Sequence, residues 1–163
     1  MPDNANQPPE EGFQDPLENY DPPQCDDPLE QALEEQPVSA IQAQPYAGIS
    51  PDETIEAAVR KLSHENVACL LVEKDGQLVG VFSDRDILNK AALEYDHVKD
   101  QPVWQVMNAD PVFVYDTDSA AAALSVMAVS GFRHVPVLNL EKKLVGIVSP
   151  QRVCRFLREH SQE

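Results

Sequence analysis

The sequence is poor in cysteine and in glycine, and both shortages limit what the chain can do. Only three of its 163 residues are cysteine, and Cys25, Cys69 and Cys154 lie too far apart to form a CxxC or Cys/His cluster. This spacing argues against the usual zinc sites. The six glycines form no Walker-type phosphate loop. No nucleophile stands beside an evident base, so the sequence predicts a protein that is not an enzyme.

Basic residues are scarce as well. The net charge is −16, and residues 1–36 contain 11 acidic residues but no lysine or arginine. The rest of the chain has 17 acidic and 12 basic residues, which makes it nearly neutral. Neither part offers the basic surface that neutralises the phosphates of a nucleic acid, so the composition argues against nucleic-acid binding.

Long apolar runs are missing too. The first residues lack the basic region and the following apolar stretch of a signal peptide. No apolar run approaches the ~20 residues that are needed to cross a bilayer. We therefore expect a cytoplasmic protein without membrane insertion.

Proline, in contrast, is abundant near the N-terminus, with seven prolines among the first 36 residues. Such a segment buries too little apolar surface to offset the entropy lost on ordering, so residues 1–36 are predicted to be a disordered acidic tail. Within the tail, Asp27 as N-cap and Pro28 at the first helical position predict a short helix over 28–35. This helix either covers the edge of the domain or docks to a partner.

The remainder of the chain contains an internal repeat. Leu78-Val79-Gly80 recurs as Leu144-Val145-Gly146, an offset of 146 − 80 = 66 residues. The same offset, without an insertion between about residues 37 and 160, matches Ala43 with Ala109, Pro45 with Pro111, Ala57 with Ala123, and Ser83 with Ser149. The sequence therefore predicts two repeats, residues 37–96 and 97–163.

Each repeat has the same expected order of elements, β-α-β-β-α. Apolar residues at helical spacing follow a short extended segment, then come two apolar strands around a polar turn, and a second helix closes the unit. The expected helices are 52–64, 84–93, 118–130 and 151–159, and the expected hairpin strands are 67–72, 78–82, 134–138 and 144–148. One unit is too small to cover its own sheet. We therefore expect an α+β fold in which the two repeats pack sheet to sheet about an approximate twofold axis.

Four segments carry a resemblance to a known family. They are residues 76–88 in the first repeat, and residues 106–112, 132–137 and 143–149 in the second. Together with the repeat, they resemble a tandem pair of cystathionine-β-synthase (CBS) domains over about residues 37–160. The resemblance implies a non-catalytic module with two clefts between the repeats. Such clefts bind adenosine-containing ligands such as AMP, ADP, ATP or S-adenosylmethionine.

In this family a G-h-x-[S/T]-x-x-[D/N] motif, where h is apolar, marks a competent cleft. The first repeat has the motif in Gly80, Ser83 and Asp86, and the two carboxylate oxygens of the acid suit the paired hydroxyls of a ribose. The second repeat has Arg152 in place of the acid, and arginine has no acceptor. The resemblance thus implies one working cleft per chain. Ser83 and Asp86 also fit an ordinary helix cap, which is the alternative interpretation.

Further residues complete the expected site. The resemblance implies that Arg133 and His134 meet the ligand's phosphates in the cleft of Asp86, although they also fit a solvated strand end. Pro45 and Tyr46 stand where the family's adenine slot begins, although an aromatic residue there also fits a core. The predicted ligand-binding set is Pro45, Tyr46, Gly80, Ser83, Asp86, Arg133 and His134, with no metal and no required cofactor.

Two functions are open from the sequence. The first is a regulatory module that senses an adenosine-containing ligand and passes a change in packing or dimerisation to an unidentified effector protein. The second is a structural or interaction module with no nucleotide site, which docks to a partner through the domain pair or the acidic tail. In either case the resemblance implies a homodimer.

Overall fold

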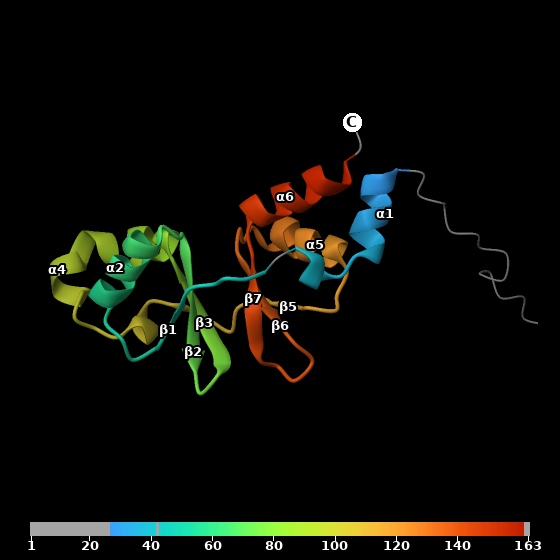
Figure 1. Cartoon of the computed structure of the whole chain (residues 1–163). Coiled ribbons are helices and arrows are strands. Elements are labelled where there is room, and N and C mark those ends of the chain that lie inside the picture. Colours follow the sequence, from blue (N-terminus) through green and yellow to red (C-terminus); the bar gives the residue numbers. More distant parts are fainter. Residues whose placement is uncertain (1–26, 42, 162–163) are drawn as a thin grey trace, which may run out of the picture.

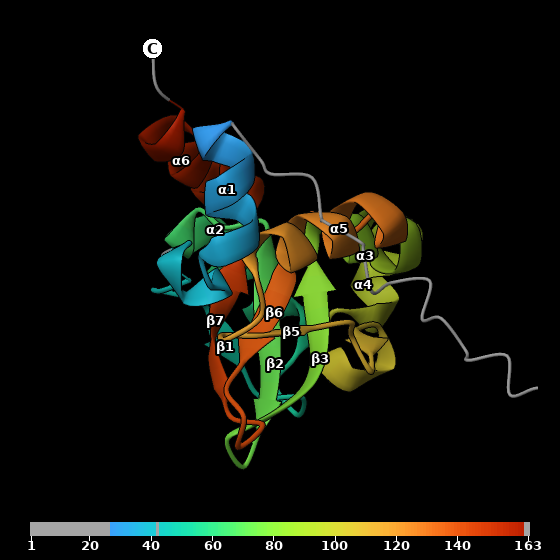
Figure 2. The same ribbon diagram turned by 90° about the vertical axis from the view of Figure 1, so that its right-hand side faces the viewer.

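The computed structural model describes residues 27–41 and 43–161, and in it the two repeats face each other through their sheets. Figure 1 shows the sheets side by side in the middle, with the helices of each repeat on the outer sides. In the turned view of Figure 2 the strands of the two sheets overlap. The predicted α+β fold of two packed repeats is confirmed. The predicted disorder of residues 1–26 lies outside the described residues.

The first repeat builds a four-stranded sheet in the order β1-β2-β3-β4. Strand β1 runs parallel to β2, while β2 and β3 form an antiparallel hairpin. Asp75 and Gly76 form its turn, both with positive φ, as two-residue hairpin turns require. The bounds are β1 (Gly48–Ile49), α2 (Ile55–Glu65), β2 (Cys69–Lys74), β3 (Gln77–Ser83), α3 (Asp84–Asp86), η2 (Ile87–Ala91), η3 (Ala92–Glu94) and α4 (Tyr95–Val98).

The second repeat repeats this plan with a three-stranded sheet in the order β5-β6-β7. Strand β5 is parallel to β6, and β6 is antiparallel to β7. The connecting turn η4 and strand β4 come before β5, and β4 pairs with β3 of the first repeat. The bounds are η4 (Val103–Gln105), β4 (Asn108–Ala109), β5 (Val114–Tyr115), α5 (Ala120–Ser130), β6 (Val135–Leu138), β7 (Leu144–Val148) and α6 (Pro150–His160).

One predicted helix, 84–93, is not a single α-helix. The chain passes from the short α3 into a wider π-helical turn, η2, and then into the 3-10 turn η3. The Lys90 ammonium group donates to the Val106 carbonyl at 2.8 Å, and Ala91 is buried in the core. The wider turn therefore lies where this segment is bonded to the chain that connects the two repeats.

The helices α2 and α5 begin later than the sequence predicts. Thr54 accepts a hydrogen bond from the Ala57 amide at 3.1 Å, and Ser119 does the same for Ala122 at 3.3 Å, so these residues are the N-caps. The predicted start of the second helix at Asp118 is wrong because its carboxylate instead accepts from the Tyr115 amide. The hydroxyl residues cap the helices, and the acid closes the turn before α5.

The expected register without insertions is also wrong by one residue. The strand pairs β1–β2 and β5–β6 keep the offset of 66. The helix caps do not, because Thr54 and Ser119 are 119 − 54 = 65 residues apart, as are the left-handed C-caps Asn66 and Gly131. Relative to the first repeat, the second therefore has one residue fewer between β5 and the cap of α5, and one residue more between the end of α5 and the start of β6, in segment 132–134.

A short N-terminal helix, α1 (Pro28–Glu35), covers the second repeat rather than the first. Asp27 caps it by accepting from the Leu29 amide at 2.8 Å, as the sequence predicts. The helix lies against α5 and α6, which both views show. The turn η1 (Val38–Ala40) follows it, and the Val38 amide donates to the Asp118 carbonyl at 2.7 Å.

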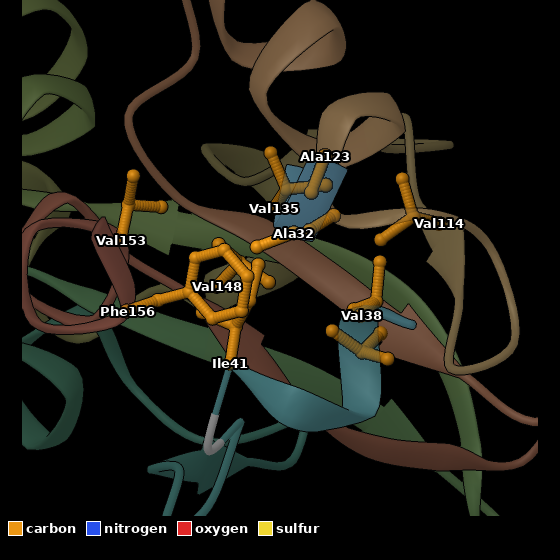
Figure 3. Close-up of a cluster of buried hydrophobic side chains, with 11 residues drawn as sticks. Ala32, Val38, Ile41, Val114, Ala123, Val135, Val148, Val153 and Phe156 are labelled. Atoms are coloured by element: carbon orange, nitrogen blue, oxygen red, sulfur yellow. The ribbon is translucent and has the colours of Figure 1, made fainter. Parts of the chain in front are cut away.

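The two repeats exchange these leading segments. Ala32, which precedes the first repeat, and Val38 and Ile41, which lie at its start, are buried with Phe156 in the core of the second repeat (Figure 3). In the same way the segment 103–106, at the start of the second repeat, contributes Val103 and Val106 to the core of the first. Each core is thus completed by chain at or before the start of the other repeat, and burial of this apolar surface stabilises the pair as a unit.

A third apolar cluster joins the two sheets. It contains residues of β2, β6 and β7, namely Cys69, Leu71, Leu138, Leu144 and Ile147. Alternating residues of each hairpin strand thus point either to the helices or to the facing sheet. Two clefts open near this cluster, one at the turn after β3 and one at the turn after β7.

Ile41→Ala tests the exchange. Ile41 is 1% exposed, so we expect the substitution to lower the free energy of unfolding by about 2–5 kcal/mol through lost burial and the cavity left behind. Urea unfolding followed by circular dichroism measures the change. Leu140→Ala is the matched control, because Leu140 is 72% exposed and should change stability by less than about 0.5 kcal/mol. Equal stability of the two variants would contradict the exchange.

Candidate functional site

The first candidate site is built on the turn from β3 to α3. The Ser83 hydroxyl accepts from the Asp86 amide at 3.4 Å, while the Asp86 carboxylate accepts from the Ser83 amide at 3.0 Å and from the Ser83 hydroxyl at 2.7 Å. This reciprocal arrangement is a capping box. The alternative interpretation of these two residues as a helix cap is therefore confirmed, and it fixes both side chains in one orientation.

A lysine holds the other oxygen of the same carboxylate. Lys90 lies 2.9 Å from Asp86 Oδ1, and the Asp86 side chain is only 15% exposed. The ion pair leaves acceptor capacity, because an ionised carboxylate offers about four lone-pair sites. Asp86 is thus a fixed and half-buried acceptor at the end of a strand.

A cleft of about 170 Å³ opens at this turn. It brings together four of the predicted ligand-binding residues, Ser83 and Asp86 from the first repeat and Arg133 and His134 from the second. The one-residue insertion found above lies in segment 132–134, which forms the far wall of the cleft. The other lining residues are Cys69, Val81, Asp84, Arg85, Asn108 and Phe132.

Gly80 is not in the lining of this cleft. A Cβ there would lie 2.5 Å from the Met107 sulfur and 3.1 Å from the Asn108 carbonyl oxygen. The glycine therefore permits β4 to approach β3 closely, as a backbone-to-backbone contact requires. Its effect on the cleft is indirect, because β4 brings Asn108 to the rim.

Pro45 and Tyr46 line a different cleft from Asp86. This second cleft, of about 480 Å³, lies at the turn from β7 to α6 and also contains Ser149 and Arg152. The chain crosses from the second repeat to the first just before β1, and the Ile147 amide donates to the Ala43 carbonyl at 2.9 Å. The crossing therefore places Tyr46 beside α6.

The equivalent crossing between β4 and β5 explains why Asn108, and not Tyr46, reaches the Asp86 cleft. Arg85 is a further residue that the predicted ligand-binding set does not include. Among the described residues Arg85 makes no ion pair, and its side chain lines the cleft. Phe132 adds a half-exposed aromatic wall. Its position just after the helix-ending Gly131 is the signal that could have found it.

Burial and neighbouring charges shift the pKa values of two groups that lie between the clefts, His134 and Cys69. Burial lowers the pKa of His134, with Arg133 and Arg152 acting in the same direction and Asp84 opposing them. Burial, together with Asp86 and Asp84, raises the pKa of the Cys69 thiol to about 12. The thiol thus stays protonated at neutral pH and is a poor nucleophile. His134 is neutral at pH 7, and both side chains line both clefts.

Within residues 27–41 and 43–161, no group of three His, Cys, Asp or Glu side chains is placed to hold a metal ion. In the same ranges no helix has the length and apolar character for crossing a membrane.

Two sheet-packed repeats, each with a cleft at a strand-to-helix turn, define a tandem type of module. The family model "CBS domain" matches residues 38–92 and 101–159. The chain belongs to the CBS domain family, as a tandem pair.

Similar proteins fit this assignment. A 17.7 kDa protein in the bps2 3′ region of Acidianus ambivalens is 34% identical over 121 residues, which are 74% of this chain and 72% of the relative. The Arabidopsis thaliana protein CBSCBSPB5 is 37% identical over 91 residues. The matched residues are 55% of this chain and only 17% of that protein. The solved structure of PAE2072 from Pyrobaculum aerophilum, complexed with AMP, has 28% identity and a TM-score of 0.67, covering 76% of this chain and 96% of the other.

The lowered pKa of His134 predicts a contribution to acid sensitivity. As pH falls through about 6.5, the unfolded chain binds a proton that the folded His134 does not yet accept, so stability is lost until the lower folded pKa is passed. His134→Gln should therefore lose less unfolding free energy than the wild type between about pH 7.5 and about pH 5.5. Urea unfolding at both pH values measures the difference. An identical loss in the two proteins would contradict the shift.

Proposed function

We propose that the protein is a non-catalytic regulatory module that binds an adenosine-containing ligand in the Asp86 cleft. The observation that carries the proposal is the meeting of a fixed carboxylate from one repeat with Arg133 and His134 from the other. Family membership and the AMP complex of a 28% identical structure support it.

The roles follow from the chemistry of the cleft. Asp86 accepts hydrogen bonds from the two ribose hydroxyls, because its orientation is set in advance by Ser83 and Lys90. The phosphate lies toward Arg133 and His134, where an arginine forms charge-assisted hydrogen bonds. These positive or protonatable groups favour a phosphorylated ligand such as AMP over the cationic S-adenosylmethionine.

Ligand binding at this place would act on the arrangement of the repeats. The cleft has one wall from each repeat. A ligand that contacts both walls stabilises the packing in which they are close, and so shifts the population of the pair toward that packing. An effector protein that recognises this packing then responds to the ligand.

We also propose that the module lies in the cytoplasm.

One observation favours the second candidate, a structural module without a nucleotide site. The capping box and the Lys90 ion pair account for Asp86 within the protein itself. A ligand is therefore not needed to explain this carboxylate, and only a binding experiment separates the two functions.

Thermal unfolding with AMP, ADP, ATP and S-adenosylmethionine tests the proposal. A ligand at 100 times its Kd should add ~2.7 kcal/mol to the free energy of unfolding. Asp86→Ala should abolish this gain because the ribose acceptor is lost. Asp118→Ala is the matched control, since Asp118 also accepts from a backbone amide at a turn but lies outside both clefts. The control should lose stability yet keep the gain from ligand.

No gain with any of the four ligands at millimolar concentration would favour the structural module. Retention of the gain in Asp86→Ala would overturn the assignment of the ribose site.

We also propose a homodimer whose contact includes α5. This helix is apolar over nearly its whole circumference, and Val129 is 89% exposed. A helix that is apolar on all sides is normally buried on all sides, so a second copy is the expected cover. Val129→Glu should convert dimer to monomer in light scattering coupled to size exclusion. Leu140→Glu, on the exposed turn between β6 and β7, should stay dimeric, and a monomeric wild type would contradict the proposal.

A further inference from the structure

A further cavity, the Asp116 cavity, lies away from both clefts at the margin of the core of the second repeat. Its volume is about 360 Å³. Val137 belongs to the core cluster of Figure 3, and Ala43 and Val145 pack against that cluster. None of the residues that line this cavity lines either cleft. The lining residues are Ser39, Ala43, Gln44, Asp116, Val137 and Val145.

The walls of the cavity come from chain at the start of the first repeat and from the sheet of the second. Ser39 lies in η1, and Ala43 and Gln44 lie in the segment that crosses to the first repeat. This segment lies directly on β7, because a Cβ at Gly146 would stand 2.5 Å from the Ala43 carbonyl oxygen. The Ile147 amide donates to the same oxygen at 2.9 Å. One wall is thus fixed by backbone contacts.

Asp116 follows β5, and its backbone is fixed on both sides. Its amide donates to the Leu138 carbonyl oxygen at 2.8 Å, and its carbonyl oxygen accepts from the Ser39 amide at 3.0 Å. The side chain has no such partner. Its Oδ1 is buried and makes no hydrogen bond, and no ion pair within the described residues includes this carboxylate. A buried acceptor without a donor is unfavourable, so a donor that enters the cavity relieves a cost.

Two other aspartates show how this chain satisfies a carboxylate next to a strand. Asp86 closes a capping box and pairs with Lys90. Asp118 accepts from the Tyr115 amide at 2.8 Å. Each of these carboxylates therefore has a role within the fold. Asp116 Oδ1 receives no such donor from the described part of the chain, so the fold alone does not explain this charge.

The other polar groups of the cavity add further acceptors. The Gln44 amide group donates through Nε2 to the Val145 carbonyl oxygen at 2.9 Å, so its own oxygen is left as an acceptor. The Ser39 hydroxyl makes no hydrogen bond with the described residues and can accept as well. No lysine, arginine or histidine is among the described residues of the lining. The cavity thus offers one negative charge and neutral oxygens beside the apolar side chains of Ala43, Val137 and Val145.

We propose that the Asp116 cavity binds a small organic cation, an ammonium group carried on a short apolar body. The ammonium group donates to the Asp116 carboxylate and to the oxygens of Ser39 and Gln44, and the apolar body packs against Val137 and Val145. The terminal torsion of an aspartate is broad, so either carboxylate oxygen can turn toward the ligand. A calcium ion fits this set less well, because it takes about six to eight oxygen ligands.

A ligand in this cavity contacts both parts of the exchanged structure. It touches η1 and the crossing segment on one side, and the sheet of the second repeat on the other. Binding therefore stabilises the exchange of leading segments. The cavity shares no lining residue with the Asp86 cleft, so this proposal and the nucleotide proposal can fail separately.

The test is a titration of the full chain with n-butylammonium chloride at constant ionic strength, followed by ¹H–¹⁵N NMR. We expect saturable shifts of the amides of Ser39, Ala43 and Asp116, with a Kd in the millimolar range for a ligand of about five heavy atoms. Asp116→Asn should weaken binding by about tenfold or more, because the charge is lost while the shape is kept.

Asp110→Asn is the matched control. Asp110 is exposed, lies outside the cavity and has a positive φ that asparagine also adopts. This variant removes the same charge by the same substitution and should leave the Kd for butylammonium unchanged.

Ser39→Ala guards against a folding defect in the Asp116 variant. Ser39 is exposed, and its bond to the Asp116 carbonyl oxygen comes from its backbone amide, which the substitution keeps. The variant should fold like the wild type and weaken butylammonium binding severalfold. Unchanged Kd values in both variants, or no saturable shift up to about 100 mM butylammonium, would overturn the proposal.

Two further ligands test the chemical class. 1-Butanol has the same apolar body without the charge and should bind at least about tenfold more weakly, whereas equal binding would remove the role of the carboxylate. Calcium chloride should leave the butylammonium Kd unchanged, and displacement of butylammonium by calcium would contradict the proposal in favour of a metal site. If AMP gives no gain in stability but butylammonium binding still depends on Asp116, the nucleotide proposal fails and this one stands.

Discussion

The exchange of leading segments is the constraint on which the rest of the molecule depends. Val38 and Ile41, at the start of the first repeat, complete the core of the second repeat. Residues 103–106, at the start of the second repeat, complete the core of the first. Neither core closes without the other repeat. The exchange also makes the chain cross between the two sheets twice, and each crossing runs past a strand-to-helix turn. The positions of both clefts are thus a consequence of how the cores are completed.

The same backbone supports two chemically different turns. In one repeat a carboxylate three residues after the serine accepts from the serine's amide and hydroxyl and pairs with an ammonium group. In the other an arginine at that place turns to the carbonyls of Ile147 and Pro45. Each side chain is satisfied by groups of the opposite polarity, so the fold tolerates both. The two turns share only their serine, and the three residues that follow it give one scaffold two electrostatic environments.

Much of this could be predicted from the sequence, because it depends on local patterns. The repeat, the two hairpins, the capping box at Ser83 and the contrast between Asp86 and Arg152 all follow from short-range spacing. Other features depend on contacts between distant residues. Nothing local places Tyr46 beside α6 rather than beside Asp86, because the chain crossing decides it. The extra residue in segment 132–134 was hidden because the flanking strands keep the offset of 66.

The shared wall of the clefts has a thermodynamic consequence. His134 and Cys69 line both cavities, so a ligand that contacts either side chain acts on the boundary of the other cleft. If a ligand in one cleft changes the affinity of the other cleft by a given factor, a ligand in the second cleft changes the affinity of the first by the same factor. Burial lowers the pKa of the His134 imidazole, so the group at this boundary becomes charged only at acidic pH. A ligand bound in one cleft would therefore change the affinity of the other cleft, and the two clefts would act as coupled sites rather than as independent ones.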